Sequence, residues 1–428
     1  MKEWTVPETC LLGVATAGAQ YEGHNPACNW IHWGREGRID DYTQPEVLVD
    51  HYHRQAEDLE LVKALGAQVY RLSIEWSRVE PERGKFSQEG IDFYRRELEG
   101  LRALGVVPMV TLHHFAHPQW FEEMGQWTRE ESVELFCIYV QKVLDELGHL
   151  IDEWIPINEP NVFVNDTFMD GKYPPGAKND VMNYFKAGKN LVLAHQKAYA
   201  MIHKHRTVNG FTGTKVGTAI HVAYFVAPED FFGEATRAFM NYAFHDLFFR
   251  GMVEGVLSFP WGFLGEKTDE AKCADFLGIN YYSRHFIVRS MNPATLFGKE
   301  TFREGMQDHE MSDLGWEIYP QGLTEICRKY YERYKLPIVI SENGIADRAD
   351  VKRMDFIRNH LKEVVRLTQE GIEVTRYCHW TFLDNLEWNE GFGPKFGLIA
   401  VDGKTLDREP RESFYRYAEI CKTHRFEG

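Results

Sequence analysis

The sequence predicts an α/β protein with the (β/α)8 architecture of a TIM barrel, formed as a single domain over residues 1–428. Short runs rich in valine, isoleucine and leucine alternate with longer amphipathic segments, as expected for the strands and helices of a parallel sheet. Eight such runs occur, which is the number of strands that closes this barrel. No low-complexity tract or linker divides the chain, so one continuous domain is expected.

The eight predicted strands begin near Leu11, Gln68, Val106, Glu153, Lys215, Asp275, Leu336 and Val374. Most intervals between them contain a helical pattern, as at 49–66 and 356–371. Gly66, Gly105 and Gly371 stand where a helix should end, a position that favours glycine. An open doubly wound sheet is the main alternative. No GxGxxG motif follows the first strand, which would have favoured that fold.

Composition restricts the class of partner. The net charge of −16 opposes binding to nucleic acid or to an anionic membrane. The first twenty residues lack the features of a signal peptide, and no run of about 18 apolar residues occurs. Seven cysteines without a CxxC pair suggest neither a disulfide framework nor a zinc knuckle. We therefore expect a cytoplasmic protein with a small-molecule partner. Self-association into a homo-oligomer is left open.

Polar and aromatic residues gather just past the predicted strand ends. Because the carboxyl ends of barrel strands meet at one mouth, these residues would line one pocket. Amides and carboxylates bind hydroxyl groups, and indole rings stack on the C–H face of a sugar, so the pattern favours a carbohydrate ligand. In chain order the residues are Gln20, Glu22, Arg71, Glu75, His113, His114, His117, Asn158, Glu159, His221, Asn280, Tyr282, Glu342, Asn343, Trp380, Glu387 and Trp388.

The fourth strand ends in the segment WIPINEP, residues 154–160. Pro160 cannot donate in a strand ladder and restricts the residue before it, so we expect the strand to stop directly after Glu159. Neighbouring strand residues face opposite sides, so Asn158 and Glu159 can serve one site only if the backbone is irregular there. Pro156, within a central strand, predicts a further irregularity at the beginning of that strand.

The seventh strand supplies a second carboxyl group. In LPIVISENG, residues 338–340 are the predicted strand, and Gly344 permits the turn that would expose Glu342. Hydrolysis of a glycosidic bond needs one protonated carboxyl group and one ionised one. Glu159 and Glu342 are the candidate pair. The ionised group would either attack the sugar directly or activate water.

Structural explanations compete with these roles. Each glutamate alone could be a surface or helix-capping group, and Arg71 could pair with a helix carboxylate. The histidines at 113, 114 and 117 suggest a metal site, but strand neighbours alternate sides and that block has no acidic ligand. The HYH sequence at 51–53 is expected to be a helix turn rather than a metal-ligand pair. His221 has no assigned role.

Nine blocks across nearly the whole chain, in order, resemble glycoside hydrolase family one, the retaining β-glucosidase family. They are GVATAGAQYEG, HYHRQAEDLELVKALG, YRLSIEWSRVEP, VTLHHFAHPQWF, NEP, GINYYS, ISENG, HWTFLDNLEWNEGF and FGLIAVD. The resemblance implies a (β/α)8 barrel that hydrolyses terminal β-D-glucosides, or also β-galactosides and β-fucosides, without a metal or cofactor. It implies Glu159 as acid/base and Glu342 as the nucleophile, facing each other across the sugar at about 5 to 5.5 Å, the separation that permits direct attack.

The resemblance also implies roles for the neighbouring residues. Arg71 and Tyr282 would contact the nucleophile and complete the catalytic group. Asn158 would bind the sugar 2-hydroxyl, a contact that strengthens in the transition state. The other implied contacts to a small β-glycoside or short oligosaccharide are Gln20, His114, Asn280, Trp380, Glu387, Trp388 and Phe396.

Some residues depart from the family pattern. Phe115 stands where tryptophan is usual, and AQYEG varies the end of the first strand, so binding of the 3- and 4-hydroxyls is less firmly implied. Members that act on 6-phosphorylated sugars carry serine at the position of Glu387 and lysine at that of Pro394, so an unphosphorylated substrate is expected. The alternatives are a β-glycosidase with another principal sugar, a non-catalytic sugar-binding relative, and a metal-dependent hydrolase.

Overall fold

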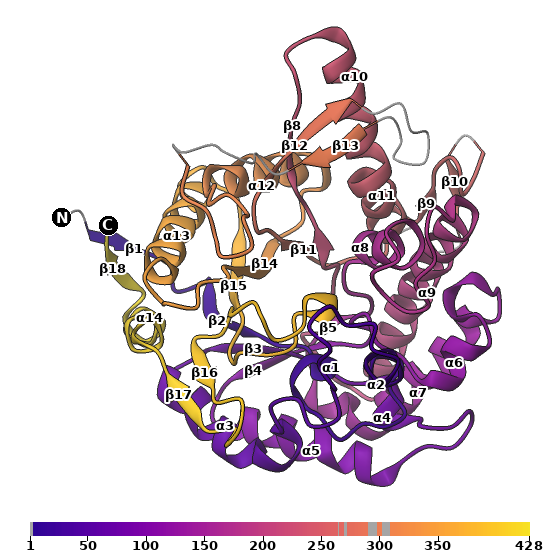
Figure 1. Ribbon diagram of the computed structural model, residues 1–428, viewed down its shortest axis with the longest axis horizontal. Coiled ribbons are helices and arrows are strands. Elements are labelled where there is room, and N and C mark those ends of the chain that lie inside the picture. The colour runs from indigo at the N-terminus through magenta and orange to yellow at the C-terminus, as the bar shows by residue number, and fades with distance from the viewer. Residues whose placement is uncertain (1–2, 264, 269–271, 290–297, 302–308) are drawn as a thin grey trace.

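The computed structural model describes residues 3–263, 265–268, 272–289, 298–301 and 309–428 (Figure 1). Its central sheet has the strand order β6-β5-β4-β3-β2-β15-β14-β11-β7. The two outer strands of this order, β6 (Lys215–Val216) and β7 (Ile220–His221), belong to one short segment, so the sheet closes into a barrel. The predicted eight-stranded barrel is confirmed, with its fifth strand divided into two pieces.

All pairings within the barrel are parallel. Each strand begins within two residues of its predicted position. Both faces of the sheet are covered, by helices outside and by packed side chains inside, which explains the nearly continuous apolar runs. The other barrel strands are β2 (Leu11–Ala15), β3 (Val69–Ser73), β4 (Val107–Thr111), β5 (Glu153–Ile155), β11 (Leu277–Asn280), β14 (Ile338–Gly344) and β15 (Val374–Trp380).

Helices surround this barrel in Figure 1. The glycines predicted to follow three of them have left-handed φ, at 70° for Gly66, 75° for Gly105 and 82° for Gly371. No helix in the described ranges is both long and apolar enough to cross a membrane. The longer helices are α3 (His51–Leu65), α5 (Gln88–Ala103), α7 (Ser132–Leu147), α9 (Val181–Val208), α10 (Phe231–Met240), α11 (Leu247–Glu254), α12 (Gln321–Tyr334), α13 (Arg353–Gln369) and α14 (Glu412–Thr423).

Shorter elements join and cover the barrel. The short helices are α1 (Gly18–Tyr21), α2 (Asn29–Arg35), α4 (Trp76–Val79), α6 (Gln119–Glu123) and α8 (Pro160–Val164). Two stretches of π-helix, Asn165–Met169 and Asn241–Asp246, continue α8 and α10. The 3-10 turns are Gln126–Thr128, Gly148–Leu150 and Trp388–Glu390. In the two-stranded sheets, β1 (Glu3–Thr5) pairs with β18 (Arg425–Glu427), β9 (Val256–Leu257) with β10 (Glu266–Lys267), and β16 (Ile399–Val401) with β17 (Arg408–Pro410). In a further small sheet, β12 (Arg284–Arg289) lies between β8 (Tyr224–Val226) and β13 (Gly298–Thr301).

The end of the fourth barrel strand differs from prediction. β5 stops at Ile155, before Pro156, and not after Glu159. Pro156 has no N–H for the ladder, so it ends the strand and does not disturb its beginning. The predicted irregular backbone is confirmed, because Glu159 has φ 38° and ψ 58°. α8 follows at once, with Pro160 in its first turn, where its missing N–H costs nothing.

The seventh strand also differs from prediction. β14 does not end at residue 340 but continues through Glu342 to Gly344, with an irregular register opposite β15 after Ile340. Gly344 does not form a turn. A Cβ atom at this position would lie 1.8 Å from the Trp380 carbonyl oxygen, so the glycine is needed for close approach of β14 and β15.

Candidate active site

The two candidate carboxyl groups come from neighbouring parts of the barrel mouth. Glu159 follows β5 and Glu342 lies in β14, and their exposed fractions are only 5% and 3%. The Asn280 amide, at the end of β11, donates to Glu159 Oε1 at 2.7 Å. Asn280 also lies opposite Glu342 in the ladder between β11 and β14. The two carboxyl groups thus flank one residue and lie in one site.

Glu342 is held by strong donors on both oxygens. The fully buried Arg71 guanidinium of β3 contacts Oε1 at 2.5 Å, and the Tyr282 hydroxyl donates to Oε2 at 2.6 Å. Arg71 also donates to Asn158 Oδ1 at 2.6 Å and to Thr111 Oγ1 at 3.2 Å. A cation and a hydroxyl donor both stabilise the charged form of a carboxyl group. Arg71 therefore lies beneath the nucleophile candidate and does not pair with a helix carboxylate.

The surroundings of Glu159 favour its protonated form. Burial, and then the charge of Glu342, raise the pKa of Glu159 well above its usual value. Burial also raises the pKa of Glu342, but Arg71 and Tyr282 act against this. Two carboxyl groups in such unlike environments divide into one acid and one carboxylate. Arg71 and Tyr282 make Glu342 the more readily ionised member of the pair.

Three predicted sugar contacts carry a buried polar atom without a hydrogen-bond partner among the described residues. They are Gln20 Oε1, His114 Nδ1 and Glu387 Oε2. For Gln20 and His114, the other polar atom of the side chain is held by the protein. Gln20 Nε2 donates to the Leu386 carbonyl at 2.5 Å, and Asn158 Nδ2 donates to His114 Nε2 at 3.1 Å. Buried polar atoms in proteins nearly always have partners, so these three are suited to the hydroxyl groups of a ligand.

Aromatic rings complete the walls of the site. The His114 ring is stacked with Trp380 at a centroid distance of 5.8 Å and with Trp388 at 5.9 Å. Phe396 lies 6.3 Å from the Tyr282 ring. Both tryptophans and Phe396 are at most 4% exposed. Rings in this arrangement provide an apolar surface beside the polar atoms, as recognition of a sugar ring requires.

The remaining strand-end residues serve the scaffold. His113 accepts from Trp127 Nε1 at 3.2 Å, and His117 lies 2.7 Å from Glu122, so the Nε2 atoms of these two rings contact residues of the scaffold. Glu22 pairs with Arg78 at 2.9 Å. Glu75 accepts from the Ser73 hydroxyl at 2.6 Å, and Asn343 Nδ2 donates to the Tyr281 carbonyl at 2.7 Å.

Two further residues lie near the carboxyl groups: Ser341, which was not predicted, and His221, which was predicted at the barrel mouth without a role. The Ser341 hydroxyl donates to Asn280 Oδ1 at 2.6 Å, which turns the amide nitrogen towards Glu159. Neighbouring residues of a regular strand face opposite sides, so Ser341 would be expected to point away from the site that contains Glu342. Both side chains reach the site because the register of β14 is irregular after Ile340. His221 Nδ1 lies 3.8 Å from Glu159 Oε1, and burial lowers the pKa of His221 to about 4, so it is neutral.

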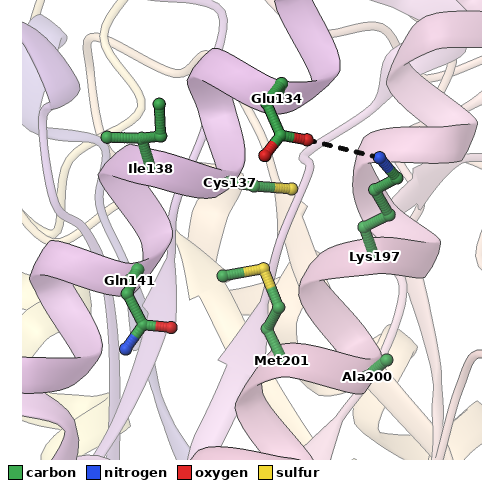
Figure 2. Close-up of a pocket in the computed structure, with 7 residues that line it drawn as sticks. All are labelled: Glu134, Cys137, Ile138, Gln141, Lys197, Ala200 and Met201. Carbon is green, nitrogen blue, oxygen red and sulfur yellow. Dashed lines mark hydrogen bonds and ion pairs between the residues drawn. The ribbon is translucent and has the colours of Figure 1, made fainter.

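A groove elsewhere on the surface has different chemistry (Figure 2). It lies between α7 and α9, and the Glu134–Lys197 ion pair of 3.5 Å stands beside Cys137 and Met201. Burial raises the pKa of Cys137 to about 11, so its thiol is unreactive. None of the residues at the strand ends lines this groove, so it is separate from the carboxyl pair.

A closed parallel barrel, with one acid and one carboxylate among unpartnered polar atoms and aromatic rings at the strand ends, defines the class of glycoside hydrolases. The comparisons with known proteins specify this class further. The model of Glycosyl hydrolase family 1 matches residues 2–426, and the chain belongs to that family.

Individual relatives agree with the family assignment. Beta-glucosidase A of Thermotoga maritima is 33% identical, with 98% of each chain covered. The solved β-glycosidase of Pyrococcus horikoshii has a TM-score of 0.91 and 32% identity, covering 100% of this chain and 97% of the other. A Thermotoga maritima β-glucosidase in complex with glucoimidazole has a TM-score of 0.87 and 29% identity over 98% and 99%. The protein is thus a β-glycosidase of a retaining family.

Proposed function

We propose that this protein hydrolyses terminal β-D-glucosides by double displacement, with Glu342 as the nucleophile and Glu159 as the acid/base. The observation that carries the proposal is the unlike environment of the two carboxyl groups. Glu342 has Arg71 and Tyr282 on its two oxygens, whereas burial and a neighbouring charge keep the proton on Glu159. These are the protonation states that the first step needs.

In the first step, a Glu342 oxygen attacks the anomeric carbon and forms a glycosyl ester. The bond to the leaving oxygen breaks, and that oxygen takes the proton of Glu159. Once Glu342 is an ester, its charge no longer raises the pKa of Glu159. Glu159 is then a better base. In the second step it accepts a proton from water, whose oxygen attacks the anomeric carbon and releases Glu342.

The sugar contacts follow from the free polar atoms. Asn158, held between Arg71 and His114, is suited to the 2-hydroxyl of the bound sugar. Gln20, His114 and Glu387 are suited to the other ring hydroxyls, because each has a free buried acceptor or nitrogen atom. These groups would accept β-galactosides and β-fucosides as weaker substrates, since each differs from the glucoside at few hydroxyls.

The preferred substrate is unphosphorylated. Burial raises the pKa of Glu387 well above its usual value, and the charges of Glu390 and Glu342 raise it further. Simple repulsion by an anionic Glu387 is therefore not the main reason to exclude a phosphate. A phosphate group at this position would instead meet three acidic side chains. Desolvation of its charge beside these acidic groups would be costly.

Two alternatives make different predictions. A non-catalytic sugar-binding relative would bind glucose without turnover of an aryl β-glucoside. The Arg71 and Tyr282 contacts to Glu342 argue against it, because sugar binding alone does not need an activated carboxylate. A metal-dependent hydrolase would lose activity with a strong chelator. We expect full turnover of an aryl β-glucoside in the presence of the chelator.

Chemical rescue tests the proposal. Glu342→Gly should abolish hydrolysis of an activated aryl β-glucoside, and azide should restore release of the aryl group. The product should be the α-glucosyl azide. Azide attacks in a single displacement, which inverts the configuration of the anomeric carbon, whereas hydrolysis uses two displacements and retains it. The exposed Glu373, changed to glycine, is the matched control and should keep its activity. Absence of rescue, or a β-glucosyl azide, would contradict the assignment of the nucleophile.

A further inference from the structure

A cluster of metal-binding side chains lies outside the active site. His24 Nε2 is 2.9 Å from Asp50 Oδ1, and His53 Nδ1 is 2.7 Å from the same oxygen. One ligand atom from each of these three residues lies within 4.8 Å of the others. We propose that His24, Asp50 and His53 bind one divalent transition-metal ion of the zinc type. This proposal does not depend on the hydrolase assignment.

The spacing of the donor atoms suits a small metal ion. Zinc bonds to imidazole nitrogen and carboxylate oxygen are about 2.0 Å long, which places tetrahedral ligand atoms about 3.3 Å apart. The two observed nitrogen–oxygen distances are 0.4 to 0.6 Å shorter than this. The shortening is about the difference between the separation of two hydrogen-bonded atoms and that of two atoms bound to the same metal ion. Rotation of exposed side chains is enough to supply that change.

The donor types select the class of metal. Two imidazoles and one carboxylate favour zinc, copper or nickel over magnesium or calcium, which prefer oxygen ligands. The side chains of His24, Asp50 and His53 are 33%, 18% and 58% exposed. Water can therefore supply the fourth ligand. Arg54 Nε lies 3.7 Å from Asp50 Oδ2, so the other oxygen, Oδ1, is the one directed to the histidines.

The backbone fixes two of the three ligands. His24 has φ 52° and Asp50 has φ 57°, in the left-handed region that costs free energy for residues other than glycine. His24 N–H donates to the Glu46 carbonyl at 2.6 Å, and the His53 N–H donates to the Asp50 carbonyl at 3.2 Å. These contacts hold the backbone of the three residues in place before a metal binds, which reduces the entropy lost on binding.

The site would fasten two segments near the barrel mouth. His24 follows α1, which carries Gln20, and His53 lies in the first turn of α3. The Tyr52 N–H already joins these segments by donating to the Glu22 carbonyl at 3.1 Å. A metal bound here would add a second connection. We therefore expect it to raise thermal stability and to leave turnover unchanged.

A hydrogen-bonded pair of the same chemistry provides the control. His203 Nε2 lies 2.7 Å from Asp275 Oδ2, but Asp275 Oδ1 is contacted by the cation Lys272, with Nζ at 3.1 Å, and by the Tyr199 hydroxyl at 3.0 Å. A histidine–aspartate hydrogen bond is thus present at both places, whereas a second histidine is present only at Asp50. His203→Ala and His53→Ala each remove one imidazole from an aspartate.

Calorimetric titration of the untagged full chain with Zn²⁺ tests the proposal. The wild type and His203→Ala should bind one Zn²⁺ per chain with equal affinity, and His53→Ala and His24→Ala should bind at least tenfold more weakly. Absence of a one-to-one site in the wild type would overturn the proposal. Equal affinities in all four proteins would also overturn it.

Thermal unfolding gives a second measurement that does not depend on activity. Zn²⁺ should raise the Tm of the wild type and of His203→Ala, because a ligand that binds only the folded state stabilises it. It should leave the Tm of His53→Ala unchanged. An equal Zn²⁺-induced rise in all three proteins would place the metal elsewhere. Hydrolysis of an aryl β-glucoside by His53→Ala, measured in parallel, shows that the variant is folded.

Discussion

Glu159 and Glu342 differ in what surrounds them, and their proposed roles rest on this difference. Arg71 and Tyr282 donate to Glu342, whereas the side-chain donor to Glu159 among the described residues is the uncharged Asn280 amide. The sequence alone predicted both glutamates and the two donors, because they occur in recognisable blocks. It did not assign a role to Ser341, which fixes the Asn280 amide, because regular alternation would turn Ser341 away.

Tyr282→Phe tests how Glu342 is kept ionised. The hydroxyl donates to Oε2 at 2.6 Å, and a hydrogen bond to a charged group is worth about 1.5–3 kcal/mol. Its loss should lower kcat/KM by about 10- to 100-fold. It should also raise the pKa of Glu342, so the acid limb of the kcat/KM profile should move to higher pH. The alkaline limb, set by loss of the Glu159 proton, should move less.

The exposed Tyr415, changed to phenylalanine, is the control for this substitution and should show the wild-type profile. A normal pH profile for Tyr282→Phe, with only KM increased, would indicate that Tyr282 binds the sugar and does not act on the nucleophile.

At the scale of single elements, prolines and glycines determine where the carboxyl groups lie. Strand positions were predictable, because the apolar runs are long and both faces of the sheet are buried. Strand ends were not. Pro156 ends β5 early, and β14 continues past Glu342 because Gly344 allows it to stay close to β15. Such details depend on the neighbouring strand, which a single sequence does not specify.

Gly344→Ala tests the close approach of β14 and β15. The added Cβ would lie 1.8 Å from the Trp380 carbonyl oxygen, a backbone atom that cannot rotate away. The strands must separate, so we expect a loss of at least about 1–3 kcal/mol in the free energy of unfolding. Urea unfolding measures this loss. Gly403→Ala is the control, because its Cβ would meet no atom within 4 Å. Equal midpoints for the two variants would contradict the close approach.

At the scale of the whole molecule, buried charges join the beginning and the end of the chain. His51 of α3 lies 2.7 Å from Asp58 and 3.2 Å from Glu97 of α5. Asp58 in turn pairs with Arg408 of β17 at 2.8 Å. Burial alone would lower the pKa of His51, but Glu97 and Asp58 raise it to about 10. The apolar pattern that predicted the barrel contains no information on this network.

The stability of the protein should therefore depend on pH through His51. A pKa raised from 6.5 to about 10 on folding gives stability that is fully present below pH 6.5 and is lost as the pH rises towards 10. His51→Gln should be less stable than the wild type at pH 6.5, by on the order of a few kcal/mol. The difference should shrink as the pH approaches 10. Urea unfolding across this range measures it.

The exposed His149, changed to glutamine, is the control for the pH series and should follow the wild type. A constant difference between His51→Gln and the wild type at every pH would show that His51 is uncharged in the folded state.

Closure of the barrel was predictable at this scale from the count of eight strand–helix units. Division of the fifth strand into β6 and β7, with residues 217–219 between them, was not. The family match over residues 2–426 agrees with the count. The cytoplasmic location stays a prediction.

Trapping the glycosyl–enzyme intermediate tests the catalytic assignment most directly. A 2-deoxy-2-fluoro-β-glucoside with a good leaving group slows both steps, because fluorine destabilises the oxocarbenium-like transition state. The wild-type protein should gain the mass of one fluoroglucosyl group, and peptide mapping should place it on Glu342. A label on Glu159, or inactivation without a covalent label, would contradict the assignment of the two carboxyl groups.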